Sequence, residues 1–259
     1  MPTNSIAFDR ASGYYDETRG FPPGEEKNAA ALLVKAGSLT AESRVLEIGI
    51  GTGRIALPLS AHVHAVYGLD IARPMMNRLR VKQEGEPVFL AEASATQLPF
   101  PADSFDAVVA VHVFHLIAGW RDVLSELKRV LKKDAPLLHA WTGRYHIEQL
   151  WDAWRAALPA NQPAIVGVSW AERETFLGNE GWRRKGDEYQ HIYTHRQSPA
   201  QFLESVRERR WSNTWPLTDD ELNAGIAAIQ AVIAANFEDP SQTVEIESGF
   251  HVRAYLSPE

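Results

Sequence analysis

The 259-residue chain contains no cysteine. This absence excludes disulfides, thiolate metal sites and cysteine nucleophiles together. The chain also lacks an apolar run of about 18 residues, the length that a membrane-spanning helix needs. Its N-terminus has no basic segment followed by an apolar stretch, which an export signal would require. We therefore expect a cytoplasmic protein without membrane insertion.

The chain also lacks an excess of positive charge, since 33 acidic residues against 26 Lys and Arg give a formal net charge of −7 at pH 7. This balance argues against nucleic acid as a partner, since a nonspecific hold on nucleic acid depends on neutralising many phosphates. The two basic clusters, residues 183–185 and 207–210, are short and typical of solvated faces. No cluster of possible ligands suggests a metal site. The hydrophobic fraction of 45% is that of an ordinary globular protein.

The most informative segment is Val45–Arg54, in which a buried apolar strand runs into a three-glycine turn. Gly49, Gly51 and Gly53 have no Cβ, so the backbone of the turn can approach a ligand closely. A helix that begins just behind the turn would present unpaired N–H groups to that ligand. The dinucleotide fingerprint G-x-G-x-x-G would need glycine at position 54, where this chain has arginine.

Four further signals follow in order along the chain. A short strand, Ala65–Asp70, ends in a carboxylate 17 residues past Gly53 (70 − 53), and an acid at this place can accept hydrogen bonds from a ribose diol. A third strand, Val88–Ala93, also ends near an acid. The remaining two signals are a proline-containing loop before the strand Ala107–Val111, and a helix at Val123–Lys132 before the strand Leu137–Trp141.

The segment Glu-x-Gly-x-Gly-x-Gly and the four signals after it resemble the class I methyltransferases that use S-adenosylmethionine (SAM). The resemblance is to the small-molecule enzymes of the ubiquinone and menaquinone biosynthesis type, and it covers residues 8–142. It implies an α/β fold with a Rossmann-like, doubly wound and mostly parallel seven-stranded sheet, an antiparallel edge hairpin and a helical cap insert. It also implies transfer of a methyl group from SAM to a small-molecule acceptor by in-line displacement.

The chain beyond residue 143 departs from this pattern. We expect residues 1–143 to form an N-terminal arm and the SAM-binding core, and 144–170 to form a cap excursion. Residues 171–195 and 243–259 would complete the sheet, and 196–242 would be a helical insert between its last two strands. Capping boxes predict that two helices of this insert begin after Ser198 and Thr218. Six tryptophans lie in or beside this part of the chain. They would either stack on an apolar or planar acceptor or form the core of the cap. They are Trp141, Trp151, Trp154, Trp170, Trp211 and Trp215.

The resemblance also assigns roles to single residues. It places the three glycines under the methionine and ribose parts of SAM, Glu47 near its amino group, and Asp70 on its ribose. Each acid has a structural alternative: a salt bridge for Glu47, and a helix N-cap for Asp70. The other cofactor contacts that it implies are Ile71, Glu92 and Ala93 at the adenine, the Val111 backbone at the methionine end, and Tyr15 and Arg19 of the Y-D-x-x-R segment.

Several of these further contacts also have a structural alternative. Glu92 is equally consistent with a solvent-facing side chain, and Tyr15 and Arg19 with surface packing of the arm. No residue is assigned as catalytic, although His112 or His115 could serve as a general base if they do not simply pack at the strand end. The alternative function is a non-catalytic SAM-binding sensor or partner protein. A nicotinamide oxidoreductase is disfavoured by Arg54, and the sequence assigns no oligomeric state.

Overall fold

The computed structural model describes residues 8–144, 147–159, 166–169, 172–173 and 175–258. The described residues form two compact units. The first unit comprises those within 1–142, 165–191 and 250–259, and the second those within 143–164 and 192–249. Every candidate cofactor residue belongs to the first unit.

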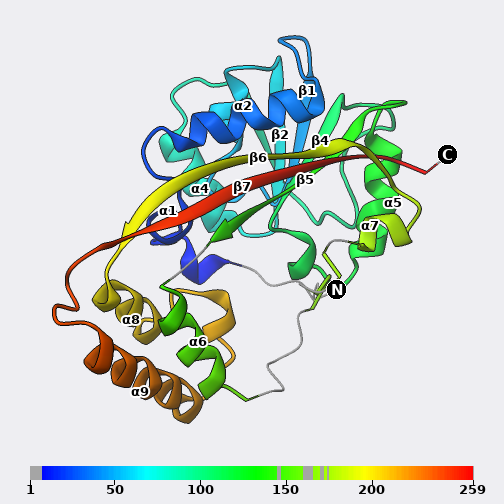
Figure 1. The fold of residues 1–259 in the computed structure, drawn as a ribbon. Helices are drawn as coiled ribbons and strands as arrows, with labels where there is room; N and C mark the ends of the chain where they lie inside the picture. The colour runs from blue at the N-terminus through cyan, green and yellow to red at the C-terminus, as the bar shows by residue number, and fades with distance from the viewer. Residues whose placement is uncertain (1–7, 145–146, 160–165, 170–171, 174, 259) are drawn as a thin grey trace. The chain divides into compact units, whose positions relative to one another are not determined.

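A seven-stranded mixed sheet organises the described chain (Figure 1). Its order is β3-β2-β1-β4-β5-β7-β6, and the pairs from β3 to β5 are parallel. In Figure 1, β7 runs opposite to its neighbours β5 and β6, which gives the predicted antiparallel edge. The strands span β1 Arg44–Ile48, β2 Ala65–Asp70, β3 Val88–Glu92, β4 Ala107–Val111, β5 Pro136–Arg144, β6 Arg183–Gln197 and β7 Val244–Leu256.

The burial of the central strands explains their sequences. All five residues of β4 are buried, and so are the four of β1 from Val45 to Ile48. Parallel strands covered on both faces are expected to be continuous apolar runs rather than alternating ones. Glu47 is the exception within β1, as a carboxylate that is only 3% exposed.

The helices of the first unit connect these strands. They are η1 Asp9–Ala11, α1 Tyr15–Arg19, α2 Glu25–Gly37, α3 Ala56–Ser60, α4 Arg73–Lys82, η2 Phe114–Leu116, α5 Trp120–Val130 and α7 Phe176–Asn179. Within residues 171–195, expected to complete the sheet, β6 is preceded by the short helix α7. The chain turns soon after it, where Gly181 takes a left-handed φ of 81°.

The second unit contains α6 Glu148–Ala157, α8 Pro199–Arg207, η3 Ser212–Thr214 and α9 Asp219–Asn236. Both predicted capping boxes are present, at Ser198 before α8 and Thr218 before α9. Trp154 is fully buried here, in a cluster that includes Trp211 and packs against Trp151. These three tryptophans are therefore core residues, whereas Trp170 lies outside the described residues. The predicted role of this part as a cap stays a prediction.

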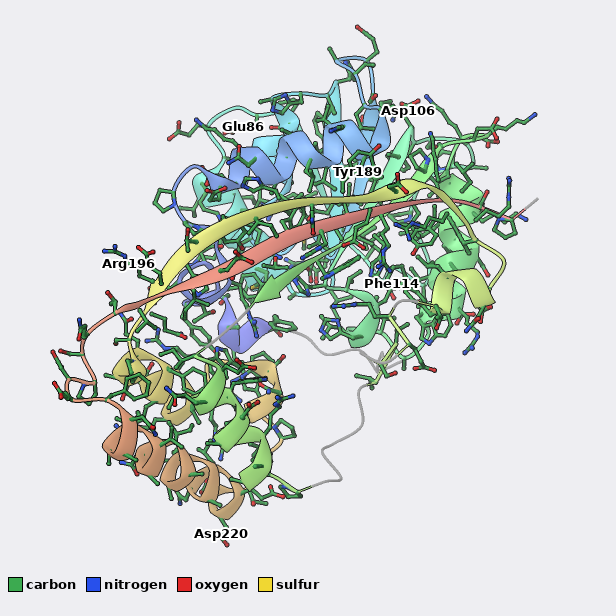
Figure 2. All side chains as sticks on the ribbon, in the orientation of Figure 1. Glu86, Asp106, Phe114, Tyr189, Arg196 and Asp220 are labelled. Atoms are coloured by element: carbon green, nitrogen blue, oxygen red, sulfur yellow. The ribbon has the colours of Figure 1, made fainter. Side chains whose placement is uncertain are left out.

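The strand order identifies the edge of the sheet where a ligand is expected. The chain proceeds from β1 outward to β3 and then returns to β4 on the other side of β1. Ligands of open α/β sheets bind at the carboxyl ends of the strands next to such a reversal. Here those ends are Ile48 of β1 and Val111 of β4. Figure 2 shows Phe114, shortly after β4, inside the first unit, whereas Asp220 points outward from α9.

No helix in the described part of the chain is both long and apolar enough to cross a membrane.

Candidate functional site

The three-glycine turn joins β1 to α3 and depends on left-handed backbone. Gly49, Gly51 and Gly53 have φ values of 69°, 56° and 76°, a region that residues with a Cβ rarely adopt. The N–H groups of Gly49 and Ile50 both donate to the carbonyl of Leu69, at 2.9 and 3.0 Å. The turn is thereby held against the end of β2, with its backbone at the carboxyl edge of the sheet.

Asp70 closes β2 and is bound by the turn. One carboxylate oxygen accepts from the Gly51 N–H at 2.9 Å, and the other accepts from the Ala72 N–H at 2.8 Å. Burial raises the pKa of this carboxyl, while the hydrogen bonds from Ala72, Gly51 and Ile71 oppose that shift. Because a carboxylate has about four acceptor positions, each oxygen still has capacity for a ligand hydroxyl. The N-cap of α4 is Ala72, without a side-chain cap bond, so the N-cap alternative for Asp70 is wrong, and the ribose-binding role stays a prediction.

The N-terminal arm, residues 8–24, is attached to the turn and to α4. Asp16 accepts from the Thr52 hydroxyl at 2.5 Å and from the Lys82 ammonium at 2.8 Å. Arg54, the residue that replaces the last glycine of a dinucleotide fingerprint, donates to the Arg19 carbonyl at 3.0 Å. Arg78 donates to two further arm carbonyls. The arm therefore lies beside the turn, as the Y-D-x-x-R interpretation requires.

Arg19 is a half-buried cation on this arm. Burial lowers the pKa of its guanidinium, the nearby Tyr15 and Tyr14 raise it, and Arg54 lowers it further. Tyr15 itself is half-buried and meets Phe8 edge to face at 5.9 Å between centroids. The Tyr14 hydroxyl, which sequence reasoning missed, is buried without a hydrogen-bond partner among the described residues. A buried hydroxyl without a partner, close to the Arg19 guanidinium, is a further candidate for ligand contact.

Glu47 lies within β1, two residues before Gly49. Its Oε2 is buried with no hydrogen-bond partner among the described residues. Burial raises the pKa of this carboxyl to about 8, with Asp70 raising it and Arg54 lowering it. No salt bridge to Glu47 occurs among the described residues, so its structural alternative has no support there. An unpartnered buried carboxyl suits a ligand amino group.

The third-strand residues are engaged within the protein. Glu92 forms an ion pair with Arg73, at 2.5 Å between Oε2 and Nε, and its side chain is 42% exposed. The Ala93 N–H donates to the Asp70 carbonyl at 3.3 Å. Ile71 is half-buried beside them. An adenine contact by Glu92 would therefore compete with Arg73, and the Ala93 N–H is already used by the strand pairing.

The chain after β4 is strained at His112, which has a left-handed φ of 50°. The Nε2 of His112 accepts from the Thr142 N–H at 2.7 Å, which ties the end of β4 to β5. His115 lies in η2, and burial together with Arg19 lowers the pKa of its imidazole to about 4. One nitrogen of His112 is thus used by the backbone, and the role of either histidine as a base stays a prediction. Val111 is buried between these strands.

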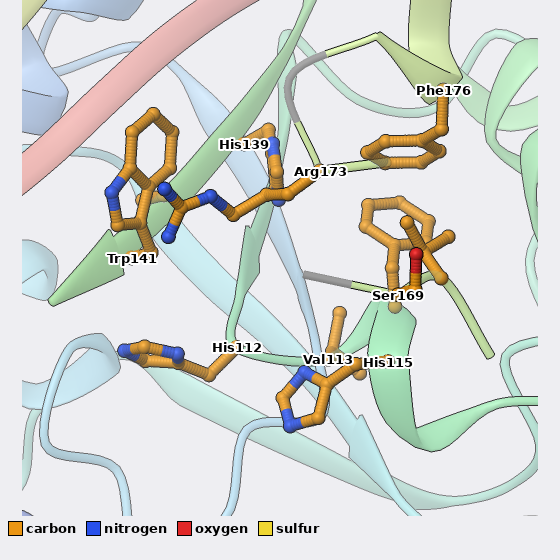
Figure 3. Close-up of a pocket in the computed structure, with 11 residues that line it drawn as sticks. His112, Val113, His115, His139, Trp141, Ser169, Arg173 and Phe176 are labelled. Carbon is orange, nitrogen blue, oxygen red and sulfur yellow. The ribbon is translucent and has the colours of Figure 1, made fainter. Parts of the chain in front are cut away.

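The structure also shows a hollow that the sequence did not reveal (Figure 3). The room inside it that a water molecule can occupy is only about 20 Å³. His112 and His115 line it, together with side chains from β5, η2 and the segment before α7. The remaining lining residues are Val113, Phe114, His139, Ala140, Trp141, Val168, Ser169, Arg173 and Phe176. No group of three His, Asp or Glu residues that could hold a metal occurs among the described residues.

Comparison with known proteins matches the segment that carries this site. A family profile described as "Methyltransferase domain" matches residues 46–138, which run from β1 into β5. The chain is 28% identical over 222 residues to the uncharacterized methyltransferase YcgJ of Bacillus subtilis, covering 74% of this chain and 85% of that protein. The crystal structure of YcgJ has the same fold, with a TM-score of 0.58 at 20% identity over 90% of this chain and 99% of that one.

Two other proteins are similar over different extents. A demethylmenaquinone methyltransferase of Thermus thermophilus is 41% identical over 95 residues, which are 35% of this chain and 43% of that protein. A phosphoethanolamine N-methyltransferase of Haemonchus contortus was solved with phosphomonomethylethanolamine and S-adenosylhomocysteine. Its TM-score is 0.54 at 18% identity, covering 97% of this chain and 58% of that one.

Proposed function

Because the chain belongs to the class I SAM-dependent methyltransferase superfamily, we propose that it transfers a methyl group from SAM to a small-molecule acceptor. The observation that carries this proposal is the joint arrangement of the glycine turn and Asp70. The turn offers close backbone approach, and the carboxylate bound to Gly51 is oriented with acceptor capacity to spare. A ribose above the turn would use both features.

The neighbouring residues fit the remaining parts of SAM. The unpartnered carboxyl of Glu47 suits the amino group, and the half-buried cation of Arg19 suits the carboxylate. Tyr15 and the Val111 backbone would complete the methionine end. For the adenine we propose Ile71 as the apolar contact. Glu92 and Ala93 remain candidates there, on the condition that Glu92 leaves Arg73 when SAM binds.

Methyl transfer itself needs alignment more than acid–base chemistry. The bond from the methyl carbon to sulfur breaks as the bond to the acceptor forms, and S-adenosylhomocysteine leaves. An acceptor that carries a proton must lose it, and His115 is the proposed base. Burial lowers the pKa of this imidazole to about 4, so it is neutral at pH 7 and can accept a proton, but as a weaker base than an ordinary histidine. No observation on the described residues favours the alternative of a non-catalytic sensor.

A small acceptor is supported by the relatives. Two of them are named for small-molecule substrates, a demethylmenaquinone and a phosphoethanolamine. The net charge of −7 gives no support for a nucleic-acid substrate. The cytoplasmic location stays a prediction.

Calorimetric titration of the protein with SAM, S-adenosylhomocysteine and NAD in parallel tests the proposal. We expect micromolar binding of both adenosyl ligands and none of NAD. If the folded protein binds neither adenosyl ligand, the proposed function is wrong.

A further inference from the structure

Arg54, the residue that departs from the dinucleotide fingerprint, holds the N-terminal arm by contacts with two of its residues. It directly follows Gly53, the last glycine of the turn, and it is half-buried. Its Nη1 donates to the Arg19 carbonyl at 3.0 Å, and its Cζ lies 5.2 Å from the centroid of the Phe21 ring. Phe21 in turn meets Phe250 of β7 edge to face, at 5.6 Å between centroids. Arg54 therefore fixes the last part of the arm beside the glycine turn.

The same side chain brings a second positive charge close to Arg19. Burial lowers the pKa of the Arg19 guanidinium, and Arg54 lowers it further, as expected for two like charges near each other. In the part of the chain that the structure describes, no carboxylate forms an ion pair with either arginine. Two neighbouring cations without a counter-charge are stabilised when an anion binds beside them. The arrangement therefore indicates an anionic group on the ligand.

Glu47 of β1 is also under the electrostatic influence of Arg54. Burial raises the pKa of this carboxyl to about 8, Arg54 opposes the rise, and Asp70 adds to it. In the free protein Glu47 is mostly neutral at pH 7, so it does not cancel the charge of the two arginines. When an ammonium group binds beside it, Glu47 can release its proton and pair with that group. The positive charge of Arg54 makes this release easier.

Glu47 and Arg54 lie at the two ends of the glycine turn. Glu47 precedes Gly49 by two residues, and Arg54 follows Gly53 directly. A ligand over the turn therefore meets a carboxyl group at one end and, at the other, the arginine that holds Arg19. An α-amino acid has an ammonium and a carboxylate on one carbon atom, so it matches this arrangement of groups.

We infer that Arg54 prepares the site for the amino-acid part of SAM: it holds Arg19 where the guanidinium can pair with the cofactor carboxylate, and it keeps a positive charge beside Glu47. Arg54 acts through these two residues, so it is a positioning residue. The inference rests on the proposed function for the identity of the ligand.

S-adenosylhomocysteine and methylthioadenosine are suitable probes, because the second keeps the adenosine and the sulfur but lacks the amino-acid part. Calorimetric titration of the full chain measures both affinities. We expect the parent protein to bind S-adenosylhomocysteine more tightly than methylthioadenosine. Arg54→Gln should weaken S-adenosylhomocysteine binding about tenfold, the effect of one charged hydrogen-bonding pair, and should leave methylthioadenosine binding within about twofold. Arg54→Lys keeps the charge and should retain part of the preference.

The pH dependence of S-adenosylhomocysteine binding gives a readout that a merely structural role would not move. The charged groups that act on Glu47 are Arg54 and Asp70. Loss of the Arg54 charge should raise the pKa of Glu47 further, because the cation that favours the ionised carboxyl is gone. The pH range in which the affinity rises should therefore move upward in Arg54→Gln and stay in place in Arg54→Lys.

The matched control is Arg78→Gln. Arg78 of α4 also donates to arm carbonyls, those of Ser12 and Gly13, each at 3.1 Å. This variant should loosen the arm but leave the ratio of the two affinities unchanged. An equal fall of the ratio in Arg78→Gln and Arg54→Gln would overturn the inference, because loosening of the arm would then explain both.

Two further results would overturn the inference alone. One is an unchanged ratio of affinities in folded Arg54→Gln. The other is equal binding of both probes by the parent protein, since the amino-acid part would then make no net contribution. If the parent binds neither probe, the proposed function is wrong and the inference falls with it.

Discussion

The Gly51 N–H donates to the Asp70 carboxylate at 2.9 Å, and this bond joins the glycine turn to the end of β2. The carboxylate proposed to bind the ribose is therefore oriented by the same turn that would pass under the cofactor. Such preorganisation reduces the entropy lost on binding. It also means that the turn and the carboxylate cannot be varied independently.

Asp70→Ala should weaken S-adenosylhomocysteine binding by about 1–3 kcal/mol, the range for a hydrogen bond to a charged group. The control is Asp187→Ala, which removes an exposed acid of β6. Calorimetry on both variants, after circular dichroism has shown that they are folded, gives the comparison. Unchanged affinity in folded Asp70→Ala would contradict the ribose role.

Gly53→Ala should destabilise the fold by more than the cost of left-handed backbone alone. A Cβ at Gly53 would lie 2.6 Å from the Leu79 side chain, whereas one at Gly85, with φ 119°, would meet nothing within 4 Å. Gly85→Ala therefore measures the backbone cost, about 1–3 kcal/mol. Urea unfolding of both variants separates the two effects. Equal losses of unfolding free energy in the two variants would show that the Leu79 side chain moves away from the new Cβ without cost.

Binding of SAM should become tighter as pH rises from 6 to 8. The pKa of Glu47 is raised to about 8, so the free protein carries a neutral carboxyl that must release a proton to pair with an ammonium group. The affinity should rise by up to about tenfold per pH unit in this window. Calorimetry in buffers of different ionisation enthalpy measures the proton released.

Glu47→Gln should flatten that pH profile, and Glu42→Gln, at an exposed position, should not. A profile that stays steep in Glu47→Gln would mean that another group releases the proton.

Asp16→Asn should loosen the N-terminal arm. The Asp16 carboxylate accepts hydrogen bonds from Thr52 and Lys82. Because Asp16 is partly exposed, its ion pair with Lys82 stabilises the fold by only about 0.2–1 kcal/mol. Hydrogen exchange of residues 8–24 should therefore be faster in the variant while global stability changes little. Glu17→Gln, at the adjacent exposed position, is the control. Identical exchange rates in the two variants would remove Asp16 from this positioning role.

The stabilising contribution of His139 should be lost on acidification. Burial lowers its pKa from 6.5 to about 3, with Arg173 adding to the shift, so the folded protein binds fewer protons than the unfolded chain. The contribution is complete above pH 6.5 and falls by about 1.4 kcal/mol per pH unit toward pH 3. Glu47 acts with the opposite sign, because its stabilising effect is greatest below pH 4.5 and is lost as pH rises toward 8.

Comparing parent and His139→Phe at each pH cancels the Glu47 contribution. The advantage of the parent over this variant should shrink between pH 6.5 and 4 in urea unfolding. His62→Phe, at an exposed histidine, should show no such trend. A constant difference across this range would mean that His139 titrates normally.

The sequence predicted the elements that local patterns determine. The fourth strand was expected at Ala107–Val111, and β4 has those bounds, because small and β-branched apolar residues between polar flanks are typical of a strand covered on both faces. The capping boxes at Ser198 and Thr218 were equally local and were confirmed.

The features of the site that the sequence does not predict depend on contacts between distant segments. Arg173 lies in a stretch without hydrophobic periodicity, and it reaches His139 only because residues 167 and 168 pair with η2. The ion pair of Glu92 with Arg73 is likewise a contact that no spacing encodes. The Tyr14 hydroxyl is buried without a hydrogen-bond partner only in the folded arm, so the sequence alone does not single it out.

The place of β7 in the strand order has a consequence for synthesis on the ribosome. β7 lies between β5 and β6, yet it begins 100 residues after β5 ends (244 − 144). At about 5–20 residues per second, translation leaves the β5 edge uncovered for several seconds after that strand emerges. An open edge of apolar residues invites pairing with other chains. A nascent chain that stops before Val244 would therefore be prone to aggregate, even if its glycine turn has already formed.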